Sequence, residues 1–229
     1  MIGRGPRTGS VICLVTPGAA GAPLSATLAQ RVAALDALIR DAVGAGIDAV
    51  QIREPDLTAR LLAEVVDAAV GASRGSPTRI LVNDRVDVAL AAGADGVHLG
   101  ARSVGAARVR EIAPAGFLIG RSIHTVDEAR AAAAGPVDYL VAGTVFASAS
   151  KLGETRLLGA RGLAEIVGAV SVPVLAIGGV DLDKMPSVAR AGASGFAAIG
   201  LFSAAHARSR LREIVARARD AFDTAGTIS

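Results

Sequence analysis

Short apolar runs alternate along the chain with longer stretches in which hydrophobic residues recur every three to four positions. The longer stretches are typical of amphipathic helices, as between Leu28 and Val43, where apolar side chains repeat at helical spacing. The short runs have the length of strands and end in polar or glycine residues. Four of these runs are Val11–Thr16, Arg79–Asp84, Phe117–Ser122 and Val172–Gly179.

A recurring phrase indicates the strands between these runs. Ala-Gly-Ile-Asp at Ala45 returns as Ala-Gly-Ala-Asp at Ala92, as Ala-Gly-Pro-Val-Asp at Ala134 and as Ala-Gly-Ala-Ser at Ala191. Each copy follows an alanine-rich stretch, has glycine where a helix ends in the left-handed conformation, and enters an apolar run. The copies are spaced by about two strand–helix units, so we expect them to precede every second strand of one sheet.

The combined pattern predicts an α/β fold in which eight strands alternate with about eight helices. Continuous apolar strands are typical of a parallel sheet buried on both faces, and this chain length fits a single (β/α)8 TIM barrel. A doubly wound open sheet is the alternative, but a repeat at every second strand favours closure. The predicted organisation is an N-terminal tail over 1–10, the barrel over 11–223 and a C-terminal tail over 224–229.

Composition excludes several classes of protein. The chain has 229 residues, of which 52% are hydrophobic and 20% charged, so it can bury one large core. No apolar run reaches the roughly 20 residues that span a bilayer, and Pro17 ends the first run too early for a signal peptide. Cys13 is the only cysteine, which excludes a disulfide framework. We therefore expect a cytoplasmic protein without a membrane partner.

The charge balance argues against nucleic acid as a partner. The net charge is only +3, aromatic residues make up 3% of the chain, and the arginines are dispersed along the predicted helices. Nucleic-acid binding needs a basic patch or stacking aromatic side chains, and neither is evident. The alanine-rich helices are compatible with a monomer and with a homo-oligomer.

In a TIM barrel the active site is built at the carboxyl ends of the strands. The polar residues predicted at those ends are Gln51, Arg53, Asn83, Asp84, His98, Arg121 and His124. Of these we expect Gln51, Arg53 and His98 to point into the lumen, because the helices cover the outer face of a barrel strand. Lumen side chains can simply satisfy one another, but so many polar groups on one rim favour a binding site.

Two glycine sites at neighbouring strand ends predict a phosphate site. Gly178 and Gly179 follow the seventh predicted strand, and Gly200 and Leu201 follow the eighth. Loops after these strands often present backbone N–H groups to phosphate, although tight turns also use glycine.

The segment after the sixth predicted strand could serve the same ligand. It contains Ser148, Ser150 and Lys151 among small residues, which suits a lid over an anionic ligand. An ordinary solvated loop is the alternative.

The histidines and lysines narrow the chemistry. His124 lies just beyond the fifth predicted strand and is the candidate general acid/base, with a purely hydrogen-bonding role as the alternative. His98 is expected in the lumen and His206 on the surface. Lys151 in a loop and Lys184 at a helix start are the only lysines, which excludes a Schiff-base aldolase.

Together these residues resemble the thiamine-phosphate synthase/TenI superfamily, from about Val11 to Phe202. The motifs that carry the resemblance are Val50–Glu54, Val82–Arg85, Ala92–Gly100, Gly120–His124, Ser148–Lys151 and Ala176–Val180. The resemblance implies an enzyme of thiamine biosynthesis. Synthases of this superfamily join a pyrimidine diphosphate to a thiazole phosphate with Mg²⁺ and release pyrophosphate. The TenI-like branch includes a tautomerase that acts on a thiazole carboxylate phosphate with a histidine and no cofactor.

The resemblance also implies roles for individual residues. Gly178, Gly179 and Gly200, with Ser148, would bind the thiazole phosphate. Residues matching those around the pyrimidine diphosphate of the synthases are Gln51, Arg53, Asn83 and Lys151, and Asp84 would be a Mg²⁺ ligand only in a synthase.

Two departures from the synthase pattern bear on the choice of branch. Pro55 stands where synthases carry a lysine, and Ser103 where they carry a second Mg²⁺-binding aspartate. Both changes weaken a diphosphate–metal site, although Arg102 could replace the lost cation. The stretch from Gly120 to His124 looks more like the TenI branch. We therefore expect a thiazole tautomerase that uses His124, with a Mg²⁺-dependent synthase as the alternative and a non-catalytic thiazole-phosphate binder as the third.

Overall fold

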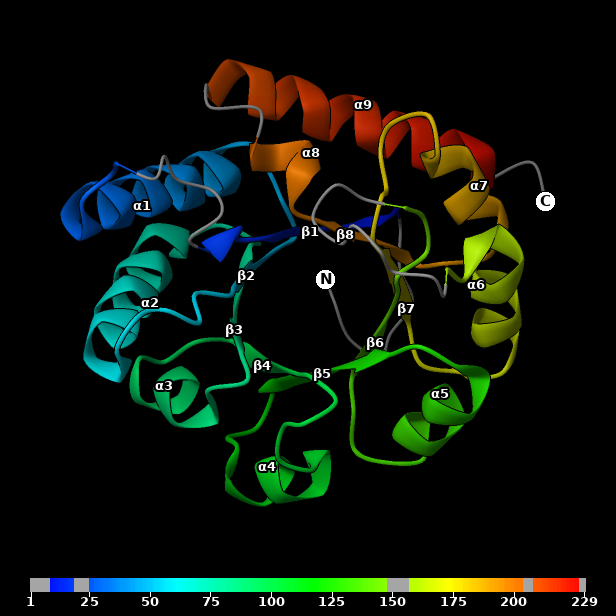
Figure 1. The fold of residues 1–229 in the computed structure, drawn as a ribbon, viewed down its shortest axis with the longest axis horizontal. Coiled ribbons are helices and arrows are strands. Elements are labelled where there is room, and N and C mark those ends of the chain that lie inside the picture. The colour runs from blue at the N-terminus through cyan, green and yellow to red at the C-terminus, as the bar shows by residue number, and fades with distance from the viewer. Residues whose placement is uncertain (1–8, 19–24, 148–156, 204–207, 227–229) are drawn as a thin grey trace.

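The computed structural model describes residues 9–18, 25–147, 157–203 and 208–226, which form a closed barrel of parallel strands (Figure 1). Each strand pairs with the next in chain order, and β1 closes the barrel against β8. The strands are β1 (Val11–Val15), β2 (Ala49–Ile52), β3 (Arg79–Asn83), β4 (Gly96–Leu99), β5 (Leu118–Ile123), β6 (Tyr139–Ala142), β7 (Val174–Ile177) and β8 (Gly195–Ala198).

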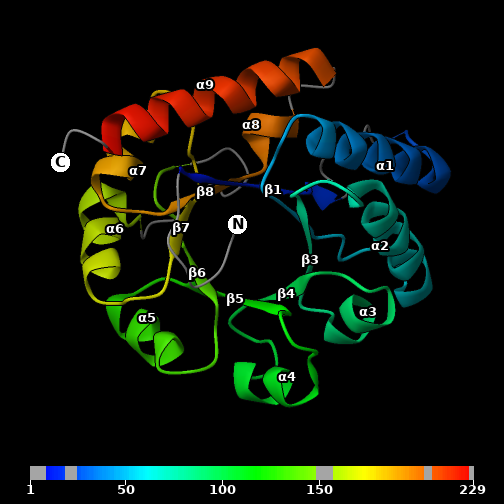
Figure 2. The same cartoon turned by 180° about the vertical axis from the view of Figure 1, so that it is seen from behind.

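Helices surround this barrel, as Figure 2 shows from behind. They are α1 (Leu28–Gly44), α2 (Ala59–Ser73), α3 (Val86–Ala91), α4 (Ala106–Ile112), α5 (Val126–Ala133), α6 (Gly159–Gly168), α7 (Met185–Arg190), α8 (Gly200–Ser203) and α9 (Arg208–Gly226). Side-chain caps begin several of them, for example Thr27 before α1, Thr58 before α2 and Thr125 before α5. No helix in the described ranges is both long and apolar enough to cross a membrane.

The predicted (β/α)8 barrel is confirmed, and the four copies of the repeated phrase precede β2, β4, β6 and β8. Three of the predicted strands, those now seen as β1, β3 and β5, differ from the observed bounds by one residue at one or both ends, and two predicted bounds differ by more. The strand expected over 172–179 is shorter, because Gly178 has a φ of +97° and leaves the strand conformation. At the other end of the chain, α9 continues to Gly226 past the predicted boundary at 223.

The aspartate of the repeated phrase has a structural role at the amino end of the barrel. In three copies it accepts a hydrogen bond of 2.8 Å from a backbone N–H of the preceding strand: Asp48 from Ile12, Asp95 from Ile80 and Asp138 from Ile119. An arginine pairs with each of these base aspartates: Arg219 at 3.0 Å, Arg79 at 2.7 Å and Arg110 at 2.6 Å. The fourth copy has Ser194 in this place.

Two apolar layers form the core. The outer layer fills the space between strands and helices, and the inner layer fills the lumen. Alternation along β1 separates them, because Val11, Cys13 and Val15 belong to the lumen while Ile12 and Leu14 face the helices. Burial raises the pKa of the Cys13 thiol to about 12, so the lumen holds it in its neutral form.

One aromatic ring fills much of the lumen near β5. Gly120 on β5 pairs in register with Tyr139 on β6. A Cβ atom at Gly120 would lie 2.1 Å from Cζ of Tyr139, so the tyrosine ring occupies the space of the missing side chain. This packing brings the buried phenol within reach of the polar groups on β4.

Candidate active site at the carboxyl end of the barrel

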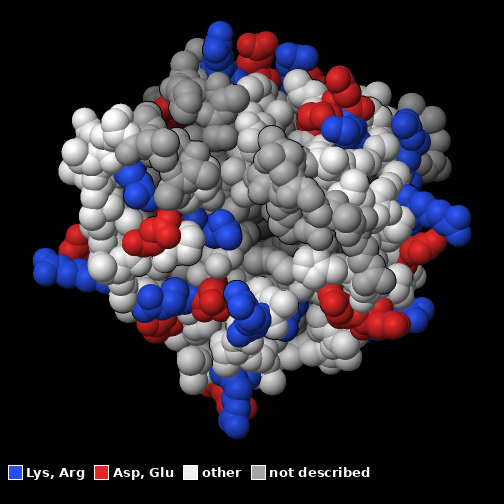
Figure 3. Space-filling model, viewed as in Figure 1, with Lys and Arg blue, Asp and Glu red and all other residues white. Residues whose placement is uncertain are grey.

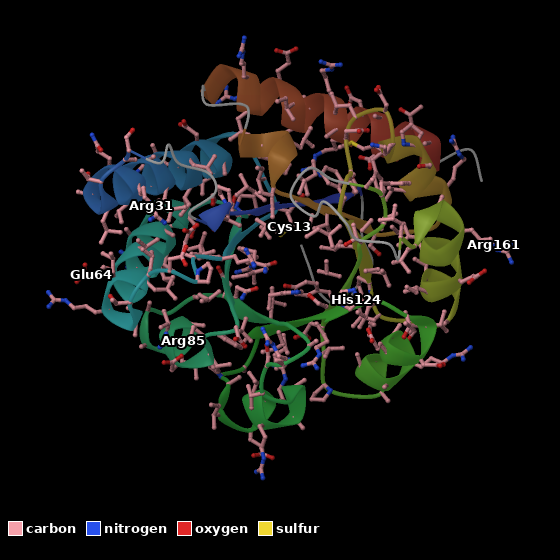
Figure 4. All side chains as sticks on the ribbon, in the orientation of Figure 1. Cys13, Arg31, Glu64, Arg85, His124 and Arg161 are labelled. Atoms are coloured by element: carbon pink, nitrogen blue, oxygen red, sulfur yellow. The ribbon has the colours of Figure 1, made fainter. Side chains whose placement is uncertain are left out.

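The polar strand ends surround a hollow in the middle of one barrel face, which Figure 3 shows with basic and acidic side chains around it. His124 lies close to the strand ring in Figure 4, whereas Glu64 and Arg161 lie out on the surrounding helices. The geometry of this rim decides which of the predicted residues act together.

His98 on β4 is buried in the lumen, as predicted, and forms the centre of a polar network. Its Nε2 lies 2.8 Å from Ser122 Oγ, and its Nδ1 lies 3.3 Å from the Tyr139 hydroxyl. Burial, with a contribution from the positive charge of Arg121, lowers the pKa of His98 to about 4. His98 is therefore neutral near pH 7, and it orients Ser122 by a hydrogen bond rather than by charge.

Ser122 and Tyr139 are the partners of His98, and sequence reasoning did not single them out. Ser122 was visible only as part of the stretch that ends at His124, and Tyr139 only as an apolar strand residue. The signal that could have found them is strand alternation. Ser122 is two residues after Gly120, so both face the lumen. Gly120 has no side chain, and the Tyr139 ring fills that space.

The structure brings two predicted residues into direct contact at the ends of β2 and β3. Gln51 is buried, and its Nε2 donates to Asn83 Oδ1 at 3.0 Å. This bond leaves the Gln51 carbonyl oxygen as an acceptor and the Asn83 amide nitrogen as a donor. The pair therefore offers complementary polar groups to a heteroaromatic ring above the lumen.

Arg53 lies just past β2 and is exposed at the rim, not buried in the lumen as expected. Its guanidinium forms no hydrogen bond or ion pair with another described residue. Its backbone N–H donates to the hydroxyl of buried Thr16 at 2.8 Å, which fixes the start of the loop.

Glu54 joins the ends of β1 and β2. Its carboxylate accepts a hydrogen bond from the Gly18 N–H at 3.3 Å, and the Thr16 hydroxyl donates to it as well. Burial raises the pKa of Glu54, and these two hydrogen bonds counteract part of that effect. Glu54 thus holds the loop next to Arg53 in place.

Asp84, the predicted Mg²⁺ ligand, has an exposed carboxylate directly after β3. Its backbone is left-handed, with a φ of +64°, and its N–H donates to the His98 carbonyl at 2.9 Å. Such a conformation is uncommon outside glycine and is found disproportionately at functional sites.

Ser103 stands at the position where the synthase pattern has its second carboxylate. Ser103 Oγ accepts a hydrogen bond from the Gly100 N–H at 2.7 Å and so closes the turn after β4. Within the described ranges, no group of three or more histidine, cysteine, aspartate or glutamate side chains could hold a metal ion.

His124 is exposed at the end of β5, in the position expected for a general acid/base. Its Nδ1 lies 2.5 Å from the Gly143 carbonyl oxygen. A carbonyl can only accept, so Nδ1 carries the hydrogen, and in the neutral tautomer Nε2 keeps a lone pair that no described residue engages. The backbone N–H of His124 also donates to Glu128 at 2.6 Å, which fixes the residue at the start of the following loop.

Arg121, the remaining predicted residue of β5, extends toward the neighbouring strand end. Its guanidinium donates to the Ala101 carbonyl oxygen at 3.5 Å. This long contact places a positive charge beside the loop that follows β4.

Packing against the segment after β6 explains why residues 178 and 179 are glycine. Both have a positive φ, +97° and +61°. A Cβ atom at Gly178 would lie 2.5 Å from Thr144 Cγ2, and one at Gly179 would lie 2.3 Å from the Ala147 carbonyl oxygen. The chain's own segment after β6 therefore excludes a side chain at both positions, whether or not a phosphate is bound.

The same turn leaves backbone donors available. The N–H groups of Gly178, Gly179 and Val180 donate to no residue that the structure describes. Gly200, at the start of α8, differs from the other two glycines because a Cβ atom added there would meet no atom of a described residue within 4 Å. Leu201 packs against the outer core. Ser148, Ser150, Lys151 and His206 lie outside the described residues.

A family model, curated relatives and a solved structure that resemble this chain all carry the name of the same enzyme. The family model described as thiamine monophosphate synthase (TMP-TENI) matches residues 25–202. A thiamine-phosphate synthase of Moorella thermoacetica is 40% identical over 186 residues, which are 80% of this chain and 89% of the relative. A thiamine-phosphate synthase of Methanoculleus marisnigri is 42% identical over 162 residues, 71% of this chain and 77% of the relative. Among solved structures, thiamine phosphate pyrophosphorylase from Pyrococcus furiosus has a TM-score of 0.75 and 30% identity, covering 94% of this chain and 96% of its own.

Proposed function

Because the chain belongs to the thiamine monophosphate synthase (TMP-TENI) family, we propose that it is a thiamine-phosphate synthase, joining a pyrimidine diphosphate to a thiazole phosphate with release of pyrophosphate. The observation that carries this proposal is the 40% identity to a synthase over 80% of the chain. The relatives support the synthase better than the tautomerase that the departures at Pro55 and Ser103 led us to expect. Two substitutions on the rim weigh less than similarity along most of the barrel.

The ends of β2 and β3 suit the pyrimidine diphosphate. The contact between Gln51 and Asn83 holds an acceptor and a donor in place for the pyrimidine ring. Arg53 stands beside this pair with an unpaired guanidinium among the described residues, and it would bind the diphosphate. Positive charge at this place stabilises the negative charge that develops on pyrophosphate as it leaves.

The residues present fit a Mg²⁺ ion held mainly by the substrate. Mg²⁺ sites in proteins commonly use one or two carboxylates together with substrate phosphates and water. Asp84 supplies one exposed carboxylate, and the neighbouring Arg85 is engaged with Asp87 at 2.9 Å and 2.5 Å. When bound, Mg²⁺ neutralises charge on the diphosphate. Since Ser103 replaces a second carboxylate, we expect weak binding of Mg²⁺ in the absence of substrate.

The thiazole phosphate would bind on the opposite side of the rim. There the N–H groups of Gly178, Gly179 and Val180 are available as donors, in the loop after β7. Backbone N–H groups are suited to phosphate because they offer several hydrogen bonds without a bulky side chain. The two substrates would then meet over the lumen, near Ser122.

The decisive experiment measures thiamine-phosphate formation from the two substrates, with and without Mg²⁺. We expect the natural chain to form product only with Mg²⁺. We expect Asp84→Asn to lose most of this activity, and the activity that remains should no longer depend on Mg²⁺. Asp87→Asn is the matched control, because it removes an exposed carboxylate three positions away that pairs with Arg85. Absence of product at any Mg²⁺ concentration would overturn the synthase proposal.

A second function is supported by the geometry of His124. The hydrogen bond to Gly143 leaves Nε2 as a base at the rim, which is what a thiazole tautomerase requires. Under this alternative His124→Ala would abolish proton exchange at the thiazole and keep phosphate binding. Binding of thiazole phosphate without turnover of either kind would instead indicate the non-catalytic binder.

A further inference from the structure

Lys184 lies immediately before α7, and the expected chemistry assigned it no role. Its Nζ donates to the Gly179 carbonyl oxygen at 3.1 Å and to Asp181 Oδ2 at 2.5 Å. The same ammonium lies 5.6 Å from the centre of the Phe146 ring, within the range of a cation–π interaction. One side chain thus joins the loop after β7 to the segment after β6.

Two hydrogen bonds, one of them from Lys184, fix the orientation of two peptide planes in this loop. The Gly178 carbonyl accepts from the Phe146 N–H at 2.9 Å, and the Gly179 carbonyl accepts from Lys184. In a trans peptide the N–H points away from the C=O of the same plane. Holding these two carbonyls therefore fixes the directions of the N–H groups of Gly179 and Val180.

Those two N–H groups are among the donors that find no acceptor in the described part of the chain. Glycine allows a wide range of backbone conformations, so consecutive glycines would let the Gly179 peptide rotate if its carbonyl were not held. The charge of Lys184 is balanced by Asp181 at 2.5 Å, so its effect on an anion is exerted mainly through the carbonyl that it holds.

We propose that Lys184 is a positioning residue that holds the Gly179 carbonyl so that the N–H group of Val180, next to that of Gly179, binds the phosphate of the thiazole substrate. The identity of this ligand rests on the proposed function. The contact between Lys184 and Gly179 is independent of it, and any phosphate monoester that enters the loop would meet the same donors.

Kinetics distinguish positioning from a general structural role. Lys184→Met keeps most of the aliphatic stem and removes the donor, and we expect KM for thiazole phosphate to rise about tenfold while kcat stays within about twofold. Lys184→Arg should restore most of the loss, because a guanidinium can donate to Gly179 and to Asp181 together. Arg190→Met is the control, since it removes the same charge from the exposed end of α7.

Binding supplies a readout that does not depend on turnover. Calorimetric titration of Lys184→Met should show about tenfold weaker binding of thiazole phosphate and unchanged binding of the dephosphorylated thiazole alcohol. Equal losses for both ligands, no loss for either, or no binding of thiazole phosphate to the natural chain would each overturn this inference. If the natural chain binds thiazole phosphate but forms no thiamine phosphate, the synthase proposal fails while the role of Lys184 stands.

Discussion

The buried His98 should make the stability of the barrel depend on pH, and His98→Gln should remove that dependence. Burial lowers the pKa of His98 from its ordinary value of 6.5 to about 4 in the folded protein. As the pH falls, the unfolded chain therefore binds the proton first. The stabilisation is complete above about pH 6.5 and is lost as the pH falls from 6.5 toward 4.

The size of the effect follows from the difference between the two pKa values. Each pH unit over which only the unfolded chain is protonated costs about 1.4 kcal/mol of unfolding free energy. The loss is about 2 kcal/mol at pH 5 and about 3 kcal/mol at pH 4. Glu54 works in the opposite direction, because its raised pKa favours the folded state on acidification. The prediction therefore concerns the difference between the natural chain and the variant.

Urea unfolding followed by circular dichroism at pH 8, 7, 6 and 5 measures this difference. The gap in unfolding free energy between the natural chain and His98→Gln should narrow by about 2 kcal/mol between pH 8 and pH 5. Tyr139→Phe is the matched control, because it removes the hydroxyl at 3.3 Å from Nδ1 and keeps the ring buried. Parallel curves for the natural chain and His98→Gln would refute the reasoning. Loss of the effect in Tyr139→Phe would show that the hydrogen bond, not burial, is the cause.

Two further changes test the packing and the amino end of the barrel. Asp138→Ala should lower the unfolding free energy by about 2 kcal/mol or more, because it leaves the Ile119 N–H and Arg110 without their carboxylate partner, whereas exposed Asp127→Ala should cost under about 0.5 kcal/mol in the same urea titration. Gly120→Ala should cost about 3 kcal/mol because of the clash with Tyr139, and the double variant with Tyr139→Val should recover part of it; additive losses in a double-mutant cycle would contradict the contact.

The repeated phrase predicted the barrel because each of its residues meets a specific structural requirement. Its glycine ends a helix, its aspartate accepts from a neighbouring strand, and an apolar strand follows, so three local requirements appear together in the sequence. The rim residues could be predicted for a similar reason. The carboxyl ends of parallel strands meet, so polar residues after apolar runs such as Gln51 and Asn83 had to lie on one rim, and these two are in contact.

The contacts that could not be predicted depend on the register between strands. His98, Ser122 and Tyr139 lie on three different strands, and only the pairing of β4 with β5 and of β5 with β6 brings them together. The contact between Lys184 and Gly179 depends on the direction of one carbonyl, which the sequence does not specify. The expectation of a tautomerase came from Pro55, from Ser103 and from the stretch that ends at His124, and similarity along most of the chain favours the synthase branch.

The base aspartates divide the barrel into two-strand units that could be separated and reassembled. Asp48 connects β2 to β1, Asp95 connects β4 to β3 and Asp138 connects β6 to β5, each within one unit. A chain break over 74–77, between β2 and β3, keeps each of the three bonds from a strand N–H to a base aspartate inside a single fragment, and it separates Asp48 only from Arg219. A break over 44–46 separates Asp48 from Ile12. Fragment complementation and circular permutation should therefore succeed at the first place more readily than at the second.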